Sequence, residues 1–170
     1  KSYMVVADVA RGDATDYSAF HIFDIEECNQ VGEYKGKIRP KDFGNILVGI
    51  AAEYNDALLV VENANIGWAT IEQIMEREYR NLYYSPTNNR DTVESYMTKF
   101  ERDKLVPGFT MSSKTRPLVV AKMIEYVRDK GVLIQSKRLI SEMRVFIWKN
   151  GKAQAQDRYN DDLIMAFGTA

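Results

Sequence analysis

Three extended segments, separated by polar turns, fill the first 36 residues, and this order constrains the fold more than any other feature. Residues 3–8 form an apolar run, while residues 18–26 and 30–36 have the composition of strands. Such an arrangement predicts an antiparallel meander. Apolar residues at helical spacing predict a helix over residues 40–54, which begins with a proline. The short apolar run at residues 57–61 is typical of a strand buried on both faces.

The rest of the chain alternates between helical and extended patterns. Helical periodicity or a capping residue predicts helices at residues 67–80, at residues 115–130, after Ser136 or Ser141, and at residues 161–169. Extended segments are predicted at residues 82–84, at residues 132–135, and in a hairpin around Asn150-Gly151. Residues 85–114 have a weak core signal and are expected to form a loop or a small hairpin. We therefore predict one α/β domain over residues 1–170. Its mixed sheet has an antiparallel meander followed by parallel strands, with helices on both faces.

Charge and cysteine content exclude several classes of protein. The chain has 23 Lys and Arg residues against 24 Asp and Glu residues, and this near balance argues against a strongly basic coat for nucleic acid. The single cysteine, Cys28, excludes an internal disulfide, and no Cys and His set is present for structural zinc. No apolar run approaches the roughly 18 residues of a membrane span, and no signal peptide opens the chain. An intracellular, reducing compartment is expected.

Acidic residues interrupt an apolar context at the ends of three predicted elements. Asp8 ends the first strand, Glu62 follows the buried strand, and Asp161-Asp162 opens the C-terminal helix. Taken singly, each acid is explained as a helix cap or a turn residue. Three converging carboxylates would repel one another, however, and a divalent cation with a preference for oxygen, Mg²⁺ or Mn²⁺, would remove that conflict. Asp16, across a turn from Asp8, is either a further ligand or a turn residue.

Several other mechanisms lack the residues that they need. The chain contains neither a P-loop nor a G-x-S-x-G nucleophile motif. Its only histidine, His21, lies within a predicted strand and is expected to be a hydrogen-bonded strand residue rather than a catalyst. Cys28 follows Glu26 and Glu27, so nothing electropositive in the sequence activates its thiol.

Basic residues gather in two parts of the sequence. One group surrounds the weakly patterned segment and consists of Arg90, Lys99, Arg102, Lys104, Lys114 and Arg116. The other consists of Lys35, Lys37, Arg39 and Lys41. Each residue alone is explained as surface charge, but two groups that flank an acidic centre could hold the phosphate backbone of a nucleic acid. Lys114 and Arg116 stand at a predicted helix start, where anions are favoured, and are predicted to contact phosphate.

Four short motifs follow one another along the chain. They are Val5-Val6-Ala7-Asp8 with Arg11-Gly12 and Asp16-Tyr17-Ser18-Ala19; Val60-Val61-Glu62-Asn63-Ala64-Asn65-Ile66-Gly67; Pro107-Gly108-Phe109-Thr110 with Lys114-Thr115-Arg116-Pro117; and Tyr159-Asn160-Asp161-Asp162-Leu163-Ile164-Met165-Ala166. In this order they resemble the nuclease domain of the large terminase subunits of tailed phages, the motors that package DNA, and most of all the T-even-like branch. The resemblance covers essentially the whole chain. One position departs from it, since some relatives carry a histidine where this chain has Tyr159-Asn160.

The resemblance implies a ribonuclease H-like fold and an endonuclease that cuts concatemeric double-stranded viral DNA with low sequence specificity. It implies that Asp8, Glu62 and Asp162 are the catalytic metal ligands, with Asp16 auxiliary and Asp161 less favoured. The expected cofactor is Mg²⁺ or Mn²⁺, with two ions bound when substrate is present. The candidate DNA contacts are Lys114, Arg116, Arg102, Lys104 and Arg90.

The same resemblance implies partners and a location. The expected partners are double-stranded viral DNA and, in the full protein, an ATPase domain, the portal and procapsid, and the small terminase subunit, with no membrane. The expected location is the host cell cytoplasm. Because the Walker motif of the motor is missing from the sequence, the chain is expected to be the nuclease half alone.

Two alternatives remain open at this point. One is another ribonuclease H-like nuclease, such as a junction resolvase or a ribonuclease H, and the other is a catalytically inactive module that grips DNA or docks on the portal. Within the last motif, neighbouring helix residues point about 100° apart, so both acids are not expected to reach one metal. Asp162 is predicted to face the sheet, and Asp161 to favour the helix dipole or pair with Arg158.

Overall fold

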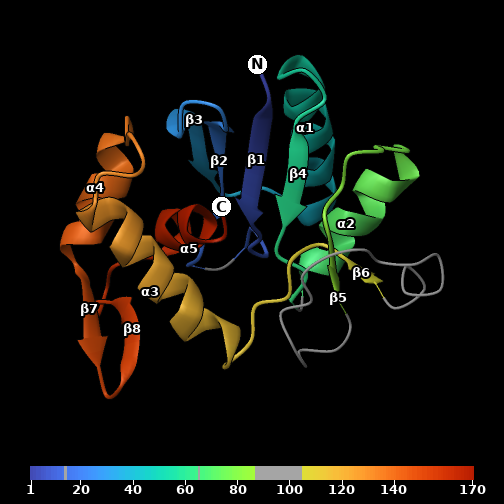
Figure 1. Cartoon of the computed structure of the whole chain (residues 1–170). Helices are drawn as coiled ribbons and strands as arrows, with labels where there is room; N and C mark the ends of the chain where they lie inside the picture. The colour runs from blue at the N-terminus through green and yellow to red at the C-terminus, as the bar shows by residue number, and fades with distance from the viewer. Residues whose placement is uncertain (14, 65, 87–104) are drawn as a thin grey trace.

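A four-stranded mixed sheet forms the centre of the computed structural model, which describes residues 1–13, 15–64, 66–86 and 105–170 (Figure 1). Strands β1 (Tyr3–Asp8), β2 (Ser18–Asp24) and β3 (Asn29–Gly36) form the predicted antiparallel meander. Strand β4 (Leu58–Val61) pairs with β1 in parallel, which gives the spatial order β3-β2-β1-β4. The predicted mixed sheet is therefore confirmed.

Parallel pairing of β1 with β4 brings two of the acidic residues to one edge of the sheet. Ala7 is paired with Val61, so Asp8 and Glu62 are the next residues along two neighbouring strands that run in the same direction. The backbone N–H of Glu62 donates to the carbonyl of Ala7 at 3.0 Å, which extends the pairing beyond β4. The strand ends that carry the two acids therefore lie side by side.

Helices α1 (Pro40–Glu53) and α2 (Gly67–Glu76) cover one face of the sheet. Since side chains alternate along a strand, Val5 and Ala7 of β1 point to this face and Val6 to the other. The buried side chains between these helices and the sheet include Val5, Ala7, Phe20, Ile22, Phe43, Leu47, Leu59, Ile71 and Ile74.

Helices α3 (Thr115–Arg128), α4 (Lys137–Arg144) and α5 (Asp162–Gly168) lie on the opposite face. Helix α5 packs directly against β1 and β2, and α3 and α4 pack around it (Figure 1). This second core contains Val6, Ala19, Phe23, Val60, Val120, Met123, Leu139, Leu163, Ile164 and Phe167. The prediction of helices on both faces is confirmed. No helix in the described ranges is long and apolar enough to cross a bilayer.

Local signals placed two later elements correctly. Strands β7 (Phe146–Lys149) and β8 (Lys152–Ala155) pair across Asn150 and Gly151, which both have positive φ, as a tight hairpin turn requires. Ser136 caps α4, because its Oγ accepts the backbone N–H of Leu139 at 3.0 Å. Ser141 lies inside that helix, so the alternative cap is excluded.

Three segments differ from their predictions. Helix α2 ends at Glu76 rather than near residue 80, and Glu78 then adopts positive φ. The strand predicted at residues 82–84 contributes only a bridge from Leu82 to β4, and the strand that forms is β5 (Tyr84–Pro86). It pairs with β6 (Leu105–Pro107), inside the segment expected to be a loop or a hairpin. Residues 132–135 likewise supply one bridge, from Leu133 to Asn29. Residues 82–84 and 132–135 pair with distant segments through single bridges or short strands, a tertiary detail that composition does not encode.

His21 is fully buried between β2 and α5, and both of its ring nitrogens have partners. Its Nε2 lies 2.9 Å from the carbonyl oxygen of Leu163, and its Nδ1 lies 2.7 Å from Nε2 of Gln30. A carbonyl only accepts and an amide nitrogen only donates, so the ring is neutral with its proton on Nε2. Burial lowers the pKa of His21 to about 4. His21 is thus a hydrogen-bonded strand residue, as predicted.

Acidification should therefore destabilise the fold through His21. The pKa of His21 is 6.5 when the ring is exposed and about 4 in the folded protein. Its contribution to the free energy of unfolding is therefore complete above pH 6.5 and is lost as pH falls toward 4. The expected loss is about 3 kcal/mol across that interval. Urea denaturation from pH 7 to 4.5 measures it, with His21→Gln as the control that lacks the titration. Because the chain has one histidine, NMR reads its pKa directly, and titration near 6.5 would contradict the prediction.

Candidate functional site

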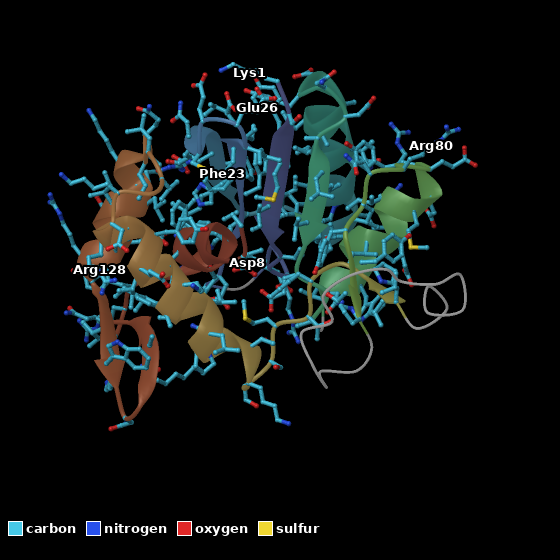
Figure 2. All side chains as sticks on the ribbon, in the orientation of Figure 1. Lys1, Asp8, Phe23, Glu26, Arg80 and Arg128 are labelled. Atoms are coloured by element: carbon cyan, nitrogen blue, oxygen red, sulfur yellow. The ribbon has the colours of Figure 1, made fainter. Side chains whose placement is uncertain are left out.

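A cavity of about 290 Å³ opens where β1 and β4 end. Figure 2 shows Asp8 at this end of β1, beside α5. The charged residues that line the cavity are Asp8, Asp16, Glu62, Arg116, Asp161 and Asp162. All five acidic residues singled out in the sequence therefore line one cavity, although they come from three distant parts of the chain.

Asp8 and Glu62 form the centre of the site, side by side where β1 and β4 end. Burial raises the pKa of Asp8 well above its ordinary value, and the nearby carboxyl group of Glu62 and the negative charges of Asp162 and Asp161 raise it further. Burial also raises the pKa of Glu62, while the nearby carboxyl group of Asp8 and the charge of Arg116 oppose that rise. The pair therefore holds a proton more tightly than exposed carboxyl groups do.

The backbone around Glu62 is held by the segment that follows β6. Phe109 donates its N–H to the carbonyl of Val61 at 2.8 Å, and Asn63 donates its own N–H to the carbonyl of Phe109 at 2.9 Å. The Asn63 side chain donates to the carbonyl of Pro107 at 2.9 Å and to Thr110 Oγ1 at 3.1 Å. The second and third sequence motifs thus pack against each other and fix the position of Glu62.

Two glycines in these motifs are required by close backbone contacts. A Cβ on Gly67 would overlap the carbonyl oxygen of Glu62, because α2 begins directly against it. Gly108 has a φ of +82°, and a Cβ there would lie 2.5 Å from the carbonyl oxygen of Val61. Any side chain at either position would displace the strand end that carries Glu62.

Asp162 is the first residue of α5, and one of its oxygens is already engaged. Its Oδ2 forms a salt bridge with Lys35 Nζ and accepts a hydrogen bond from Asn160 Nδ2, both at 3.2 Å. Lys35 Nζ also donates to Glu142 Oε1 at 2.5 Å. The other oxygen of Glu142 accepts the backbone N–H groups of Leu163 at 3.0 Å and Ile164 at 3.3 Å, and so caps α5.

Sequence reasoning missed Glu142 and assigned Lys35 only to a basic group. The two residues are 107 positions apart, on α4 and β3, so no local signal could have paired them. Asn160, in the motif whose sequence departs from the resemblance, donates its amide to Asp162.

Asp161 pairs with Arg116, which corrects the predicted pairing with Arg158. Arg116 Nη2 donates to Asp161 Oδ2 at 3.1 Å and to the carbonyl of Ala153 at 3.3 Å, so it joins α3 to the cavity and to β8. Arg116 Nε is buried, and in the described ranges it has no acceptor. Arg158 is exposed and lies in a turn with positive φ.

The remaining residues predicted for the site are exposed or lie outside the described residues. Asp16 is exposed at the rim of the cavity, and Lys114 is exposed directly before α3. Three candidate DNA contacts, Arg90, Arg102 and Lys104, lie outside the described residues.

The donor chemistry of the cavity fits a hard divalent cation, although the carboxylates are not drawn around one point. Within the described ranges, no three His, Cys, Asp or Glu side chains form a group that could hold a metal ion. Asp162 instead turns one oxygen to Lys35. A cation would offset the burial and the repulsion that raise the pKa of Asp8. The metal ligand set therefore stays a prediction.

Comparison with known proteins bears on the fold. No family model matches the sequence. The large terminase nuclease of the thermophilic phage G20c, crystallised with bound magnesium, is similar with a TM-score of 0.73 and 17% identity, over 99% of this chain and 79% of that one. Its structure with bound cobalt has a TM-score of 0.72 at 17% identity, with the same coverage. The nuclease domain of the Thermus phage P74-26 large terminase has a TM-score of 0.67 at 19% identity, over 99% and 77% of the two chains. The fold is thus the one expected from the sequence resemblance.

Proposed function

We propose that this chain is the nuclease domain of a phage DNA-packaging terminase and that it cleaves concatemeric double-stranded DNA with low sequence specificity. The observation that carries the proposal is the meeting of Asp8, Glu62, Asp161 and Asp162 in one cavity. Four acids gathered where β1 and β4 end and α5 begins are costly to the fold unless they serve a cation. The large terminase nuclease of phage G20c, which has the same fold, supports this assignment, since it was crystallised with magnesium and also with cobalt.

In this proposal Asp8, Glu62 and Asp162 hold Mg²⁺ or Mn²⁺, with two ions when DNA is bound and Asp16 in an auxiliary role. Such ions supply an activated water and stabilise the leaving 3′ oxygen. Asp8 and Glu62 would hold the ions as carboxylates, so both would have to be deprotonated for the ions to bind. With Arg116 at the inner wall and Lys114 outside, the chain offers positive charge to the phosphate backbone. Contacts limited to phosphate give low sequence specificity.

The wider assignment follows the same resemblance. We propose residues 1–170 as one nuclease domain that works in the host cell cytoplasm beside an ATPase domain, the portal and procapsid, and the small terminase subunit. We expect the domain to cleave DNA without these partners, so the test uses the chain itself.

The chain should nick or cut plasmid DNA in Mg²⁺ or Mn²⁺, and EDTA should abolish the activity. Ca²⁺ should bind but support little turnover, because its flexible coordination positions the attacking water poorly. Gel analysis of plasmid, a four-way junction and an RNA–DNA hybrid measures both activity and substrate class. Cutting in EDTA would refute the metal mechanism. A preference for the junction or the hybrid would indicate another nuclease, and metal-free binding without cleavage would indicate a DNA-gripping module.

Lys114 and Arg116 should contribute to DNA binding through phosphate contacts. Replacing both by Ala should weaken binding and reduce the salt dependence of log K by about 1–2 units. Fluorescence anisotropy at several salt concentrations measures the slope. Lys122→Ala is the matched control, because Lys122 is an exposed cation in the same helix that pairs with Glu125. An unchanged slope in the double variant would mean that both residues are ordinary surface charges that do not contact DNA phosphate.

A further inference from the structure

Lys35 is a partly buried cation in contact with two carboxylates next to the acidic cavity. Its side chain is only 15% exposed, and those of Glu142 and Asp162 are 12% and 9% exposed. Its Nζ lies 2.5 Å from Glu142 Oε1, 3.2 Å from Asp162 Oδ2 and 5.0 Å from the centre of the Tyr17 ring. One positive charge is therefore shared unequally between two acids, and the shorter contact is the one to Glu142.

The two acids differ in how firmly they are held. Both oxygens of Glu142 are used, one by Lys35 and the other by the first N–H groups of α5, so its position is set by α4 and by the helix start. In Asp162, Oδ2 forms the salt bridge with Lys35 and accepts a hydrogen bond from Asn160. Its Oδ1 accepts no hydrogen bond in the described part of the chain, yet it is not sealed from solvent, and Asp162 lines the cavity. Asp162 thus has one oxygen held by the protein and one open to the cavity.

We propose that Lys35 is the resident counter-cation of Asp162 and that it moves toward Glu142 when a divalent cation enters the cavity. This inference rests on the proposed function. Two partly buried carboxylates as close as Asp162 and Glu142 destabilise a fold unless a cation lies between them. Lys35 fills that role without metal, but it competes with an entering cation for the same carboxylate. Glu142 weakens the competition because it offers Lys35 a fixed second acceptor. Lys35 and Glu142 are positioning residues that set how tightly the site takes a cation.

The proposal predicts opposite effects for the two residues. Lys35→Met removes the competing cation and should tighten Mn²⁺ binding about tenfold. Glu142→Gln leaves Asp162 as the one carboxylate that Lys35 contacts, and it should weaken Mn²⁺ binding by about threefold or more. Both effects are within the usual range of coupling between contacting charges. The Gln side chain can still accept the N–H groups of α5. In the Lys35→Met background the effect of Glu142→Gln should disappear, because no lysine is left to redirect.

Calorimetric titration of the apo chain with Mn²⁺ measures these affinities, with thermal unfolding to show that each variant is folded. Lys35→Arg keeps the positive charge, so its Mn²⁺ affinity should stay closer to the wild-type value than that of Lys35→Met. The matched control is Arg138→Met. Arg138 pairs with Glu33 at 2.8 Å, so it joins the same strand and helix as the Lys35–Glu142 pair without touching Asp162. Its loss should leave the Mn²⁺ affinity within about twofold of the wild-type value, as expected for separate sites.

The outcomes separate this inference from the proposed function. Mn²⁺ binding in wild type that Asp8→Asn removes supports the acidic cavity as the metal site. If that holds but Lys35→Met weakens Mn²⁺ binding, Lys35 is a structural ion-pair partner. If the effects of Lys35→Met and Glu142→Gln simply add, Lys35 acts only as a distant charge. Either result overturns this inference and leaves the proposed function standing. If wild type binds no Mn²⁺ in the cavity, both are overturned.

Discussion

Replacing Asp8 by Asn should make the protein more stable and at the same time abolish DNA cleavage. The raised pKa of Asp8 shows that its charged form is disfavoured by burial and by the neighbouring acids. Asn has nearly the same shape without the charge, so it removes that cost. We expect the melting temperature at pH 7 to rise by about 2–4 °C, the response of a domain of this size to about 1 kcal/mol. Cleavage should fall about 1,000-fold, which corresponds to about 4 kcal/mol of lost barrier reduction.

The pH dependence of this stability gain identifies its cause. A group whose folded pKa is raised contributes stability below its unfolded pKa, near 3.8, and loses it as pH rises through the folded value. The difference between Asp8→Asn and wild type should therefore be largest at neutral pH and vanish near pH 4. Thermal unfolding at several pH values measures it. Asp16→Asn is the matched control, because Asp16 is an exposed acid on the same cavity. A destabilised Asp8→Asn would contradict the electrostatic account.

Asp162→Asn should abolish cleavage, while Asp161→Asn should keep most of it. Asp162 follows the helix start, lines the cavity and is predicted to hold the metal, which needs its charge. The Asn oxygen can still accept from Lys35 and Asn160, so the fold should remain. Asp161 instead pairs with Arg116, with side chains 28% and 24% exposed, and losing that partly exposed pair should cost at most about 1 kcal/mol.

Plasmid cleavage in Mn²⁺ and urea denaturation of both variants measure these effects. Because the two residues are adjacent and of one type, each variant is the control for the other. Loss of cleavage in Asp161→Asn with activity kept in Asp162→Asn would move the site assignment by one residue, and the ion pair with Arg116 would then be a contact that metal binding must break.

Local sequence patterns were enough to predict most of the elements. The alternation and turns of the first 36 residues, the helix over residues 40–54 and the hairpin at Asn150-Gly151 all appear where they were predicted. Each of these depends on interactions within a few residues, such as helical periodicity or a turn that requires positive φ. The strand predicted at residues 82–84 failed for the opposite reason, because its backbone pairing depends on β4 and on the distant β6.

The acidic residues could be selected from the sequence because a carboxylate next to a buried strand is costly and therefore conspicuous. Their meeting followed from one topological fact, the parallel pairing of β1 with β4, which sets Asp8 beside Glu62. What each acid touches could not be derived in the same way. Arg116 lies 45 residues from Asp161, and Lys35 lies 107 residues from Glu142.

The sequence by itself therefore determined the fold class, the order of the elements and the identity of the acids, because these depend on hydrophobic periodicity and on turn chemistry. Tertiary structure alone decided which cation neutralises which acid. Electrostatic pairing depends on distance in space, and residues far apart in the chain come within 4 Å only after the helices have packed on the sheet. The raised pKa values of Asp8 and Glu62, the cap that Glu142 places on α5 and the contact of one Asp162 oxygen with Lys35 are consequences of that packing.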